Sequence, residues 1–424
     1  MASRRGLAER TTVKFRFGQD DFEFFFQWLT GAQTHGGSEV GEAFFAASQI
    51  RDGDPESWAR EWSSLADRVE ARARSSLAGG HRVSAREAFL RAYFYRRAPL
   101  AFMHPSDARY RPTYEAARDL FREGASLADP VIEPFRIPFE HANLNGYLIR
   151  PSEDPGPHPT IMMFGGGDTF VEDLYFYLGP SGTKRGYNVV IVDLPGQGIL
   201  PADGLVMRAD AETPMTAIVN HVVQYESVDL ERLAAFGISA GGYLIPRAAT
   251  AETRIRACVA SSAILDFHDV WARNTSLAKL ARLENTPAMR LLERLPSRRV
   301  AAVSRLISTY MWRWGADSIS DLLERSKPMA FDPAQLDCPM LVLIGQQEYD
   351  KFEASREWAH RCIDEATSNH KQLIVTPTDE GAATHAIGTN LSLMSQLVFD
   401  WLDDVFDDES ADRRMELHEQ ANAI

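Results

Sequence analysis

A serine flanked by glycines, in the segment Gly-Ile-Ser239-Ala-Gly, is the strongest chemical signal in the chain. The apolar run Leu233–Phe236 before it is typical of a buried strand, and the residues from Tyr243 to Ala251 favour a helix. A serine at such a strand-to-helix turn is held in a strained conformation that exposes its hydroxyl, as a nucleophile requires. The alternative is a glycine-rich turn whose serine only caps the helix.

A serine nucleophile needs a base within hydrogen-bond reach and an acid that orients this base. His385 ends a polar loop after the last apolar run, and we expect it to be the base. Glu348 lies three residues after the run Met340–Gly345 and is the preferred acid. Asp350 is the alternative acid and Asp266 a further one, because adjacent loops can supply this group. The order serine, acid, histidine, each soon after a predicted strand, favours catalysis.

An oxyanion hole needs two backbone amides directed at one point. The triple glycine Gly165–Gly167 follows a predicted buried strand and leaves its backbone free of side chains. We predict that the amides of Gly167 and Ala240, with Gly166 beside them, form this hole. A phosphate-binding loop fits less well, because the segment lacks Gly-x-Gly-x-x-Gly spacing and a Walker lysine, and Asp168 stands where a phosphate would lie.

The elements that position these residues alternate between strands and helices. Half-exposed strands are predicted at residues 132–139 and 144–150, and buried ones at 160–164, 188–193, 233–236, 257–261, 340–344 and 372–376. Because helix-like segments separate the buried runs, the sequence predicts a mostly parallel α/β sheet. Ligand sites in such sheets lie at the carboxyl ends of the strands. The turn Asp193–Gly198 is assigned a structural role.

Helical patterns precede the sheet and interrupt it. Residues 1–130 are predicted to form a helical N-terminal cap domain, with one helix from 56 to 76 and another starting at Ser84, whose spacing to Glu87 is that of a capping box. Residues 131–410 form the catalytic domain. It contains a helical insertion at 266–328, before the acid-bearing strand, which we place over the carboxyl ends of the strands. Residues 411–424 are predicted to be a frayed polar tail.

Composition limits the class of partner. A formal net charge of -14 without a basic stripe argues against nucleic acid, and a small molecule fits better. Cys258, Cys338 and Cys362 are far apart, which indicates neither a disulfide framework nor a metal site, and we expect no cofactor and a cytoplasmic location. The sequence shows no secretory signal and no membrane span. It leaves the oligomeric state open, with a homodimer as one candidate.

Over residues 84–406 the chain resembles a group of α/β-hydrolases with a helical N-terminal cap, which includes 2,6-dihydroxypseudooxynicotine hydrolase and the fungal yellowish-green heptaketide hydrolases. The matching motifs are Ser84–Tyr95, Phe164–Thr169, Asp193–Gly198, Gly237–Gly242 and Glu380–His385. The resemblance implies an α/β-hydrolase fold with Ser239 as nucleophile and His385 as base. The acid of this group is usually an aspartate in a Gly-x-x-Asp setting, and the matching residue here is Glu348, a departure that keeps Asp350 open.

Members of this group hydrolyse carbon–carbon bonds beside a ketone, and some shorten polyketide chains. The resemblance therefore implies a serine hydrolase of secondary metabolism or catabolism. The same groups hydrolyse esters and thioesters, so a carboxylesterase or thioesterase stays open. So does an elimination or cyclisation enzyme with His385 as its base. A non-enzymatic binding protein is disfavoured, because such proteins commonly lose a member of the triad.

Aromatic residues of the two helical regions are the candidates for the roof of the site. We predict that Tyr93, Phe102, Asp168 and Trp271 contact the substrate; the other aromatic candidates are Phe25, Trp28 and Trp312. An apolar, enclosed pocket would favour an aromatic or polyketide-like ketone over a peptide or a sugar. For most of these aromatics the simpler interpretation is a helical core.

Overall fold

Eight strands form a single sheet in the order β1-β2-β4-β3-β5-β6-β7-β8. The computed structural model describes residues 13–154, 156–273 and 307–422, with side chains as far as Asp407. The strands are β1 (Glu133–Phe139), β2 (Ala142–Ile149), β3 (His158–Phe164), β4 (Asn188–Val192), β5 (Val228–Ile238), β6 (Ala257–Ser261), β7 (Met340–Gly345) and β8 (Lys371–Thr376). β2 pairs antiparallel with β1 and β4, and all other pairs are parallel. The predicted α/β class is confirmed, and β5 starts at Val228 instead of Leu233.

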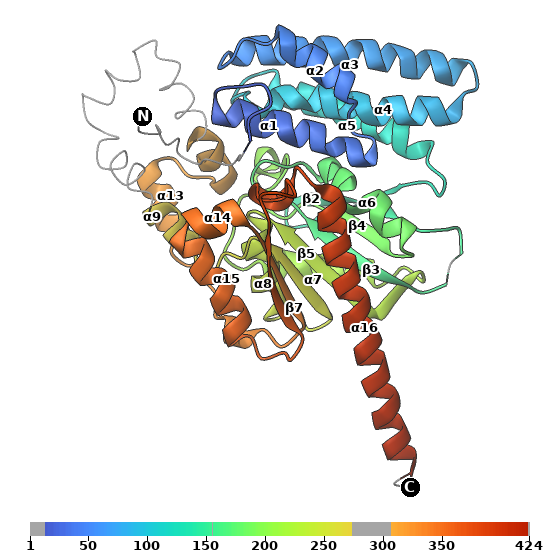
Figure 1. Ribbon diagram of the computed structural model, residues 1–424, viewed down its shortest axis with the longest axis vertical. Coiled ribbons are helices and arrows are strands. Elements are labelled where there is room, and N and C mark those ends of the chain that lie inside the picture. The colour runs from blue at the N-terminus through green and yellow to red at the C-terminus, as the bar shows by residue number, and fades with distance from the viewer. Residues whose placement is uncertain (1–12, 155, 274–306, 423–424) are drawn as a thin grey trace.

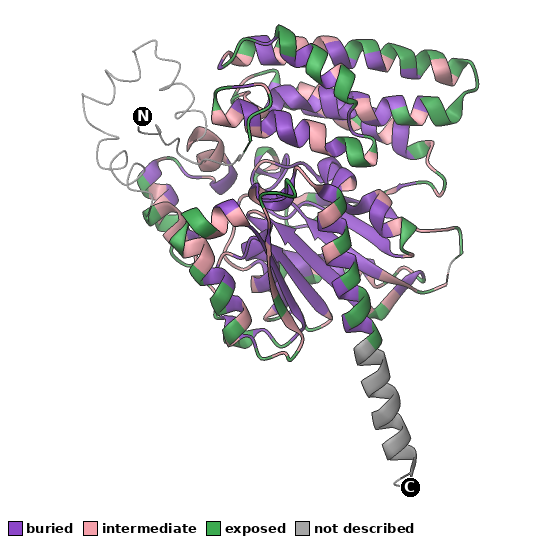
Figure 2. Cartoon of the chain, viewed as in Figure 1, coloured by how far each residue is buried: buried purple, intermediate pink, exposed green. Residues whose placement is uncertain are grey.

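The buried strands are apolar on both faces because helices cover both (Figure 1). Along β3, Ile161 and Met163 face α6 (Tyr175–Lys184) and α16 (Leu391–Asn422). Met162 and Phe164 belong to the opposite core, with α7 (Glu212–Val222), α8 (Gly241–Ala249) and α15 (Glu353–Glu365). The central strands β4, β6 and β7 are buried at every residue (Figure 2).

The N-terminal helices form a layer on one end of the catalytic domain (Figure 1). They are α1 (Asp20–Gly31), α2 (Val40–Gln49), α3 (Pro55–Ala78), α4 (Arg82–Arg97) and α5 (Tyr110–Ser126), with the short 3-10 helices η1 (Ala32–His35) and η2 (Ala98–Ala101). Most of their buried aromatic residues share one core with residues of α6 and α16, while Tyr110 and Tyr114 of α5 belong to a separate cluster with Phe170. The helical cap is therefore as predicted, and it packs directly on the catalytic domain.

Two helix boundaries differ from the prediction. α4 begins at Arg82, so Ser84 lies inside its first turn and is not the N-cap. The cause is the end of α3, where Gly80 adopts a φ of 81° and the His81 amide donates to Ser76 O at 2.9 Å. α16 continues to Asn422, so the boundary predicted at residue 411 falls within this helix (Figure 1).

The predicted insertion at 266–328 is helical where the structure describes it. It contains α9 (Phe267–Ala272), helical residues 307–314 and α13 (Ile319–Ser326), and residues 274–306 lie outside the described ranges. The remaining short elements are η3 (Val171–Leu174), η4 (Leu200–Asp203), η5 (Pro333–Gln335), α14 (Gln346–Lys351) and η6 (His385–Ile387). In the described part of the chain, no helix combines the length and apolarity needed to cross a membrane.

Candidate active site

Ser239 occupies the turn between β5 and α8, as its motif predicts. Its φ is 55°, a left-handed conformation that costs a non-glycine residue about 1–3 kcal/mol. Two backbone bonds hold the turn: the Ser239 amide donates to Ser261 O at 2.6 Å, and the Gly242 amide donates to Ser239 O at 2.8 Å. The strained turn places Ser239 on the wall of a cavity.

Gly166 and Gly242 must be glycines because neighbouring atoms lie too close to them for a side chain. A Cβ on Gly166 would lie 2.5 Å from Ser239 Cβ, and one on Gly242 would lie 1.8 Å from Ser262 O. Real side chains do not tolerate such distances, so any larger residue would displace the serine or the loop after β6. The glycines therefore let three loops converge on Ser239.

Ser239, His385 and Glu348 form one chain of hydrogen bonds. His385 Nε2 lies 2.9 Å from Ser239 Oγ, and His385 Nδ1 contacts Glu348 Oε1. In this arrangement Nδ1 donates to the carboxylate, so Nε2 is free to accept the serine proton. The other oxygen, Glu348 Oε2, accepts a hydrogen bond from Ser262 Oγ at 2.5 Å.

Of the three candidate acids, Glu348 is the one that contacts His385. It is the third residue of α14, directly after β7. Asp350 lies two residues further along the same helix and is exposed. Asp266 caps α9, where its side chain accepts from the Asp269 amide at 3.1 Å. The geometry therefore favours Glu348, although its residue type departs from the motif of the group.

His385 is the first residue of η6, whose following residues are conformationally unusual. Ala386 and Ile387 have φ values of 56° and 53°, which force the chain to turn sharply after the histidine. From the cap, the Phe24 ring lies against the imidazole with the ring centroids 6.4 Å apart. Helix α1 of the cap therefore contacts the predicted base.

The backbone amides near Ser239 differ in whether they already donate a hydrogen bond within the protein. The Gly166 amide donates to Thr169 Oγ1 at 2.9 Å, which corrects the prediction that Gly166 supplies an oxyanion donor. Gly167 and Ala240 line the cavity beside Ser239 and stay the candidate donors. Ala240 is also the N-cap residue of α8, so the helix N-terminus adds positive potential at this point.

Ser239 opens on a cavity of about 440 Å³. Its described apolar lining comes mainly from the insertion and from the segment around α15. These residues are Ala263, Ile264, Phe267, Val270, Trp271, Ile307, Tyr310, Leu322, Phe352, Ala354 and Trp358. Its charged lining residues are Asp21, Asp168, Asp269, Arg273 and Glu348. A cavity of this size and lining suits a small, largely apolar molecule.

The predicted substrate contacts divide into two groups. Asp168 and Trp271 line the cavity. Tyr93 is fully buried where the cap meets the catalytic domain, and its hydroxyl donates to Asp173 Oδ1 at 2.7 Å, while the half-buried Phe102 ring stacks on Phe22 at 4.3 Å. Neither is among the described residues that line the cavity, in contrast to their prediction as substrate contacts. Aromatic residues at helical spacing pack first against their own helices.

The other aromatic candidates also lie away from the described cavity lining. Phe25 and Trp28 are buried and pack against each other, with ring centroids 6.0 Å apart. Trp312 packs against Tyr110, with ring centroids 5.5 Å apart. The insertion, more than the cap, thus supplies the described roof of the cavity.

Comparison with known proteins identifies the family of this chain. The family model Esterase FrsA-like matches residues 49–327. The chain belongs to this family. It is 31% identical over 410 residues to "20-hydroxy-prefusarin hydrolase FUS2" of Gibberella moniliformis, covering 92% of this chain and 97% of that protein. It is 32% identical over 419 residues to "Hydrolyase poxO" of Penicillium oxalicum, covering 91% and 97%.

Solved structures share the fold of this FrsA-like chain. The crystal structure of 2,6-dihydroxy-pseudo-oxynicotine hydrolase matches with a TM-score of 0.68 at 20% identity, over 89% of this chain and 95% of that one. AbyA5 matches with a TM-score of 0.55 at 14% identity, over 89% and 99%. The protein is therefore an enzyme of the α/β-hydrolase family, and the group suggested by its motifs is confirmed.

Beneath the site, this α/β-hydrolase contains buried carboxyl groups. Burial raises the pKa of Glu172 to about 7 and raises that of Asp193 well above its usual range. The Tyr147 hydroxyl donates to Glu172 Oε1 at 3.0 Å, and the Val171 amide donates to Asp193 Oδ2 at 3.2 Å. Glu172 is part of η3 in the loop that follows β3, and Asp193 binds the backbone of the same element.

The turn Asp193–Gly198 has the structural role that we predicted. Gln197 Nε2 donates to Gly165 O at 2.5 Å, and Arg313 Nη1 donates to Gly198 O at 3.3 Å. The turn therefore links the triple glycine to the insertion. Among the described residues, no group of three or more His, Cys, Asp or Glu side chains could hold a metal ion.

Sequence analysis missed several polar residues around the site. They are Arg97, Asp173, Gln197, Ser262 and Arg313. Ser262 could have been found, because it directly follows β6 at the carboxyl edge of the sheet. Arg97 and Asp173 also left a signal, since each is a charged residue at the edge of an aromatic, apolar segment.

Proposed function

We propose that this α/β-hydrolase uses Ser239 as a nucleophile to break the carbon–carbon bond beside the ketone of an aromatic or polyketide-like small molecule. The observation that carries the proposal is the hydrogen-bond chain from Ser239 through His385 to Glu348, which opens on a cavity of about 440 Å³ with a mainly apolar wall. Its partner is thus a small-molecule substrate, without nucleic acid or membrane.

In the first half-reaction, Ser239 Oγ attacks the ketone carbon and His385 Nε2 takes the hydroxyl proton. The carbonyl oxygen becomes an oxyanion, which the amides of Gly167 and Ala240 stabilise. When the oxyanion collapses, the carbon–carbon bond breaks and its electron pair leaves on the neighbouring carbon. His385 returns the proton to this carbon, and the acyl group stays on Ser239.

In the second half-reaction, water attacks the acyl-serine while His385 accepts one of its protons. The second oxyanion collapses, the carboxylic acid leaves, and His385 returns the proton to Ser239 Oγ. The step that needs a special substrate is the first, because the leaving carbon must stabilise negative charge. A β-diketone meets this need because its leaving group is an enolate, and an acyl-phenol meets it through its ring-keto tautomer, from which the leaving group is a phenolate.

The wall of the cavity supports this substrate class. Trp271 and Tyr310 present aromatic surface near Ser239, and their ring centroids lie 4.9 Å apart. Flat conjugated ketones pack well on such surfaces. The names of the relatives support a small-molecule hydrolase, since they include "20-hydroxy-prefusarin hydrolase" and "2,6-dihydroxy-pseudo-oxynicotine hydrolase".

Two other activities are favoured by specific observations. The family model is described as esterase-like, so carboxylester or thioester hydrolysis by the same three groups is the second candidate. One relative is named a hydrolyase, which favours an elimination with His385 as base and Ser239 as a positioning group. Acyl-enzyme formation distinguishes these routes, because elimination needs none.

The test compares two substrate classes and identifies the products. kcat/KM is measured for β-diketones and acyl-phenols, and for short p-nitrophenyl esters, in water enriched in oxygen-18. We expect the larger ketones to have the higher kcat/KM and to yield a carboxylic acid containing one oxygen-18 atom. A wide advantage for short esters would contradict carbon–carbon hydrolysis and make an esterase the better assignment.

A further inference from the structure

An arginine of the cap is buried beside the loop that carries the oxyanion donor. Arg97 is the last residue of α4 and its side chain is 2% exposed, while its partner Asp173 in η3 is 0% exposed. Removing two charges from water costs several kcal/mol per ion unless hydrogen bonds satisfy them. Both charged groups of the Arg97–Asp173 pair must therefore have their hydrogen bonds satisfied. The partners in these hydrogen bonds show which segments the pair connects.

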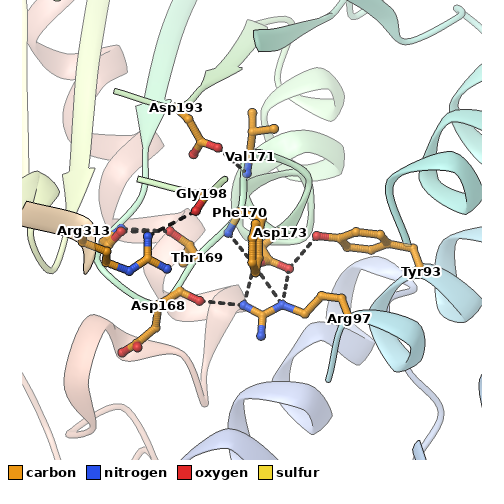
Figure 3. A network of polar contacts seen from close by, with 11 residues as sticks. Tyr93, Arg97, Asp168, Thr169, Phe170, Val171, Asp173, Asp193, Gly198 and Arg313 are labelled. Carbon is orange, nitrogen blue, oxygen red and sulfur yellow. Dashed lines mark hydrogen bonds and ion pairs between the residues drawn. The ribbon is translucent and has the colours of Figure 1, made fainter. Parts of the chain in front are cut away.

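Asp173 accepts hydrogen bonds from both sides of the domain boundary (Figure 3). From the cap, Arg97 Nε and Nη2 donate to its two oxygens at 2.9 and 2.6 Å, and the Tyr93 hydroxyl donates to Oδ1 at 2.7 Å. From the catalytic domain, the Phe170 amide donates to Oδ2 at 2.8 Å. The guanidinium also lies over the Trp28 ring, 4.1 Å from its centroid. Together these contacts fix the orientation of the Arg97 guanidinium.

The same guanidinium reaches the backbone next to the oxyanion donor. Arg97 Nη2 donates to Asp168 O at 2.7 Å, and Asp168 directly follows Gly167. We call residues 165–173 the oxyanion loop. Two contacts from within the catalytic domain hold it as well: Thr169 Oγ1 accepts from the Gly166 amide, and Gln197 Nε2 donates to Gly165 O.

We propose that Arg97 is a positioning residue for the oxyanion hole, so that docking of the cap sets the rate of the chemical step. The inference rests on the proposed serine mechanism, because it concerns where the Gly167 amide stands when the oxyanion forms. Oxyanion donors act only when they are held at hydrogen-bond distance from the developing charge, and small displacements reduce the rate strongly. The bond from Arg97 to Asp168 O fixes the peptide group between Asp168 and Thr169, one residue beyond Gly167 in the same loop.

The central variant is Arg97→Lys. Lysine keeps the positive charge but lacks the planar guanidinium, which donates hydrogen bonds to Asp173 and to Asp168 O at the same time. The matched control is Arg96→Lys on the same helix, since Arg96 pairs with Asp67 at 2.5 Å on the outer surface of the cap. We expect kcat to fall by about 10- to 100-fold in Arg97→Lys, with KM within about threefold of wild type and the control unchanged.

A trifluoromethyl ketone distinguishes positioning from a general loss of structure. Such a ketone adds to Ser239 and places an oxyanion in the hole, whereas the carboxylic acid product binds the cavity without one. We expect the affinity for the trifluoromethyl ketone to fall by the same factor as kcat in Arg97→Lys, and the affinity for the acid product to stay unchanged. Equal losses for both ligands, or wild-type kcat in a folded Arg97→Lys, would overturn the proposal.

Asp173→Asn keeps the proposal testable if Arg97→Lys fails to fold, because it preserves side-chain volume and weakens the same anchor. The expected pattern is the same, a loss in kcat matched by the trifluoromethyl ketone, and wild-type values would again overturn the proposal. Failure of the underlying function is distinguishable. If Ser239→Ala retains activity, the serine mechanism is wrong, whereas an inactive Ser239→Ala beside a fully active Arg97→Lys rejects only the role of Arg97.

Discussion

Ser262 Oγ donates a 2.5 Å hydrogen bond to Glu348 Oε2, the carboxylate oxygen that does not contact His385. The acid is therefore held at both oxygens, by the base on one side and by the residue after β6 on the other. A hydrogen bond to a charged group contributes about 1.5–3 kcal/mol, enough to decide which rotamer the carboxylate adopts. Ser262 is thus part of what orients His385.

Ser262→Ala should lower kcat by about tenfold, because the carboxylate loses one anchor and supports the imidazolium less well. Ser262→Thr, which retains the hydroxyl, should restore most of the rate. The control is Ser261→Ala, since Ser261 Oγ is buried without a hydrogen-bond partner among the described residues. A Ser262→Ala enzyme with wild-type kcat would show that Glu348 needs no second anchor.

Glu348→Gln should lose most activity, about 10³- to 10⁴-fold in kcat, because an amide stabilises the histidinium poorly. Asp350→Asn should change kcat little, since Asp350 is exposed on the far part of α14. The measurement is kcat for both single variants and for the double variant, which reports any coupling between the neighbouring residues. The opposite ranking would move the acid to Asp350.

Trp271→Ala should lower kcat/KM for aromatic ketones by about 10-fold or more, because Trp271 lines the cavity. Its indole nitrogen is buried without a partner among the described residues, so Trp271→Phe tests whether the N–H contacts the substrate. Trp312→Ala is the matched control, since Trp312 packs on Tyr110 instead. Equal effects of the two alanine variants in folded enzyme would reject Trp271 as a substrate contact.

Folding stability should fall as pH rises from about 4.5 to about 7, because Glu172 titrates near 7 when folded and near 4.5 when unfolded. In this window the folded state binds more protons than the unfolded state, so the slope of the unfolding free energy with pH is negative. The total cost is about 3 kcal/mol above pH 7. The Glu172→Gln side chain cannot ionise, so this variant should show a smaller change in unfolding free energy between pH 5 and pH 8, measured by urea titration. An unchanged difference between the two pH values would show that Glu172 does not cause the pH dependence.

The strands and the serine, acid and histidine positions could be predicted because each depends on local pattern. β6 and β7 are continuous apolar runs, and Ser239 sits in a motif whose geometry follows from its own glycines. His385 and Glu348 could be placed by chain order relative to strands, since parallel strands bring their carboxyl ends to one edge. These inferences need no knowledge of long-range packing.

The side-chain contacts of the cap could not be predicted from the sequence to the same extent. Tyr93 and Trp271 look alike in sequence, each an aromatic residue in a helical segment, yet the first is fully buried where the cap meets the catalytic domain and the second lines the cavity. Which face of a helix meets the catalytic domain depends on contacts between residues far apart in the chain, such as Arg97 with Asp173.

The central claim is that Ser239 is the nucleophile, and the most direct measurement is kcat/KM of Ser239→Ala on a ketone that the wild type cleaves. The substitution removes one oxygen and should leave the circular dichroism spectrum and the unfolding midpoint unchanged. The account predicts a loss of about 10⁴-fold or more, because the covalent route is gone and only binding and the oxyanion hole remain. A folded Ser239→Ala enzyme within tenfold of wild type would contradict it.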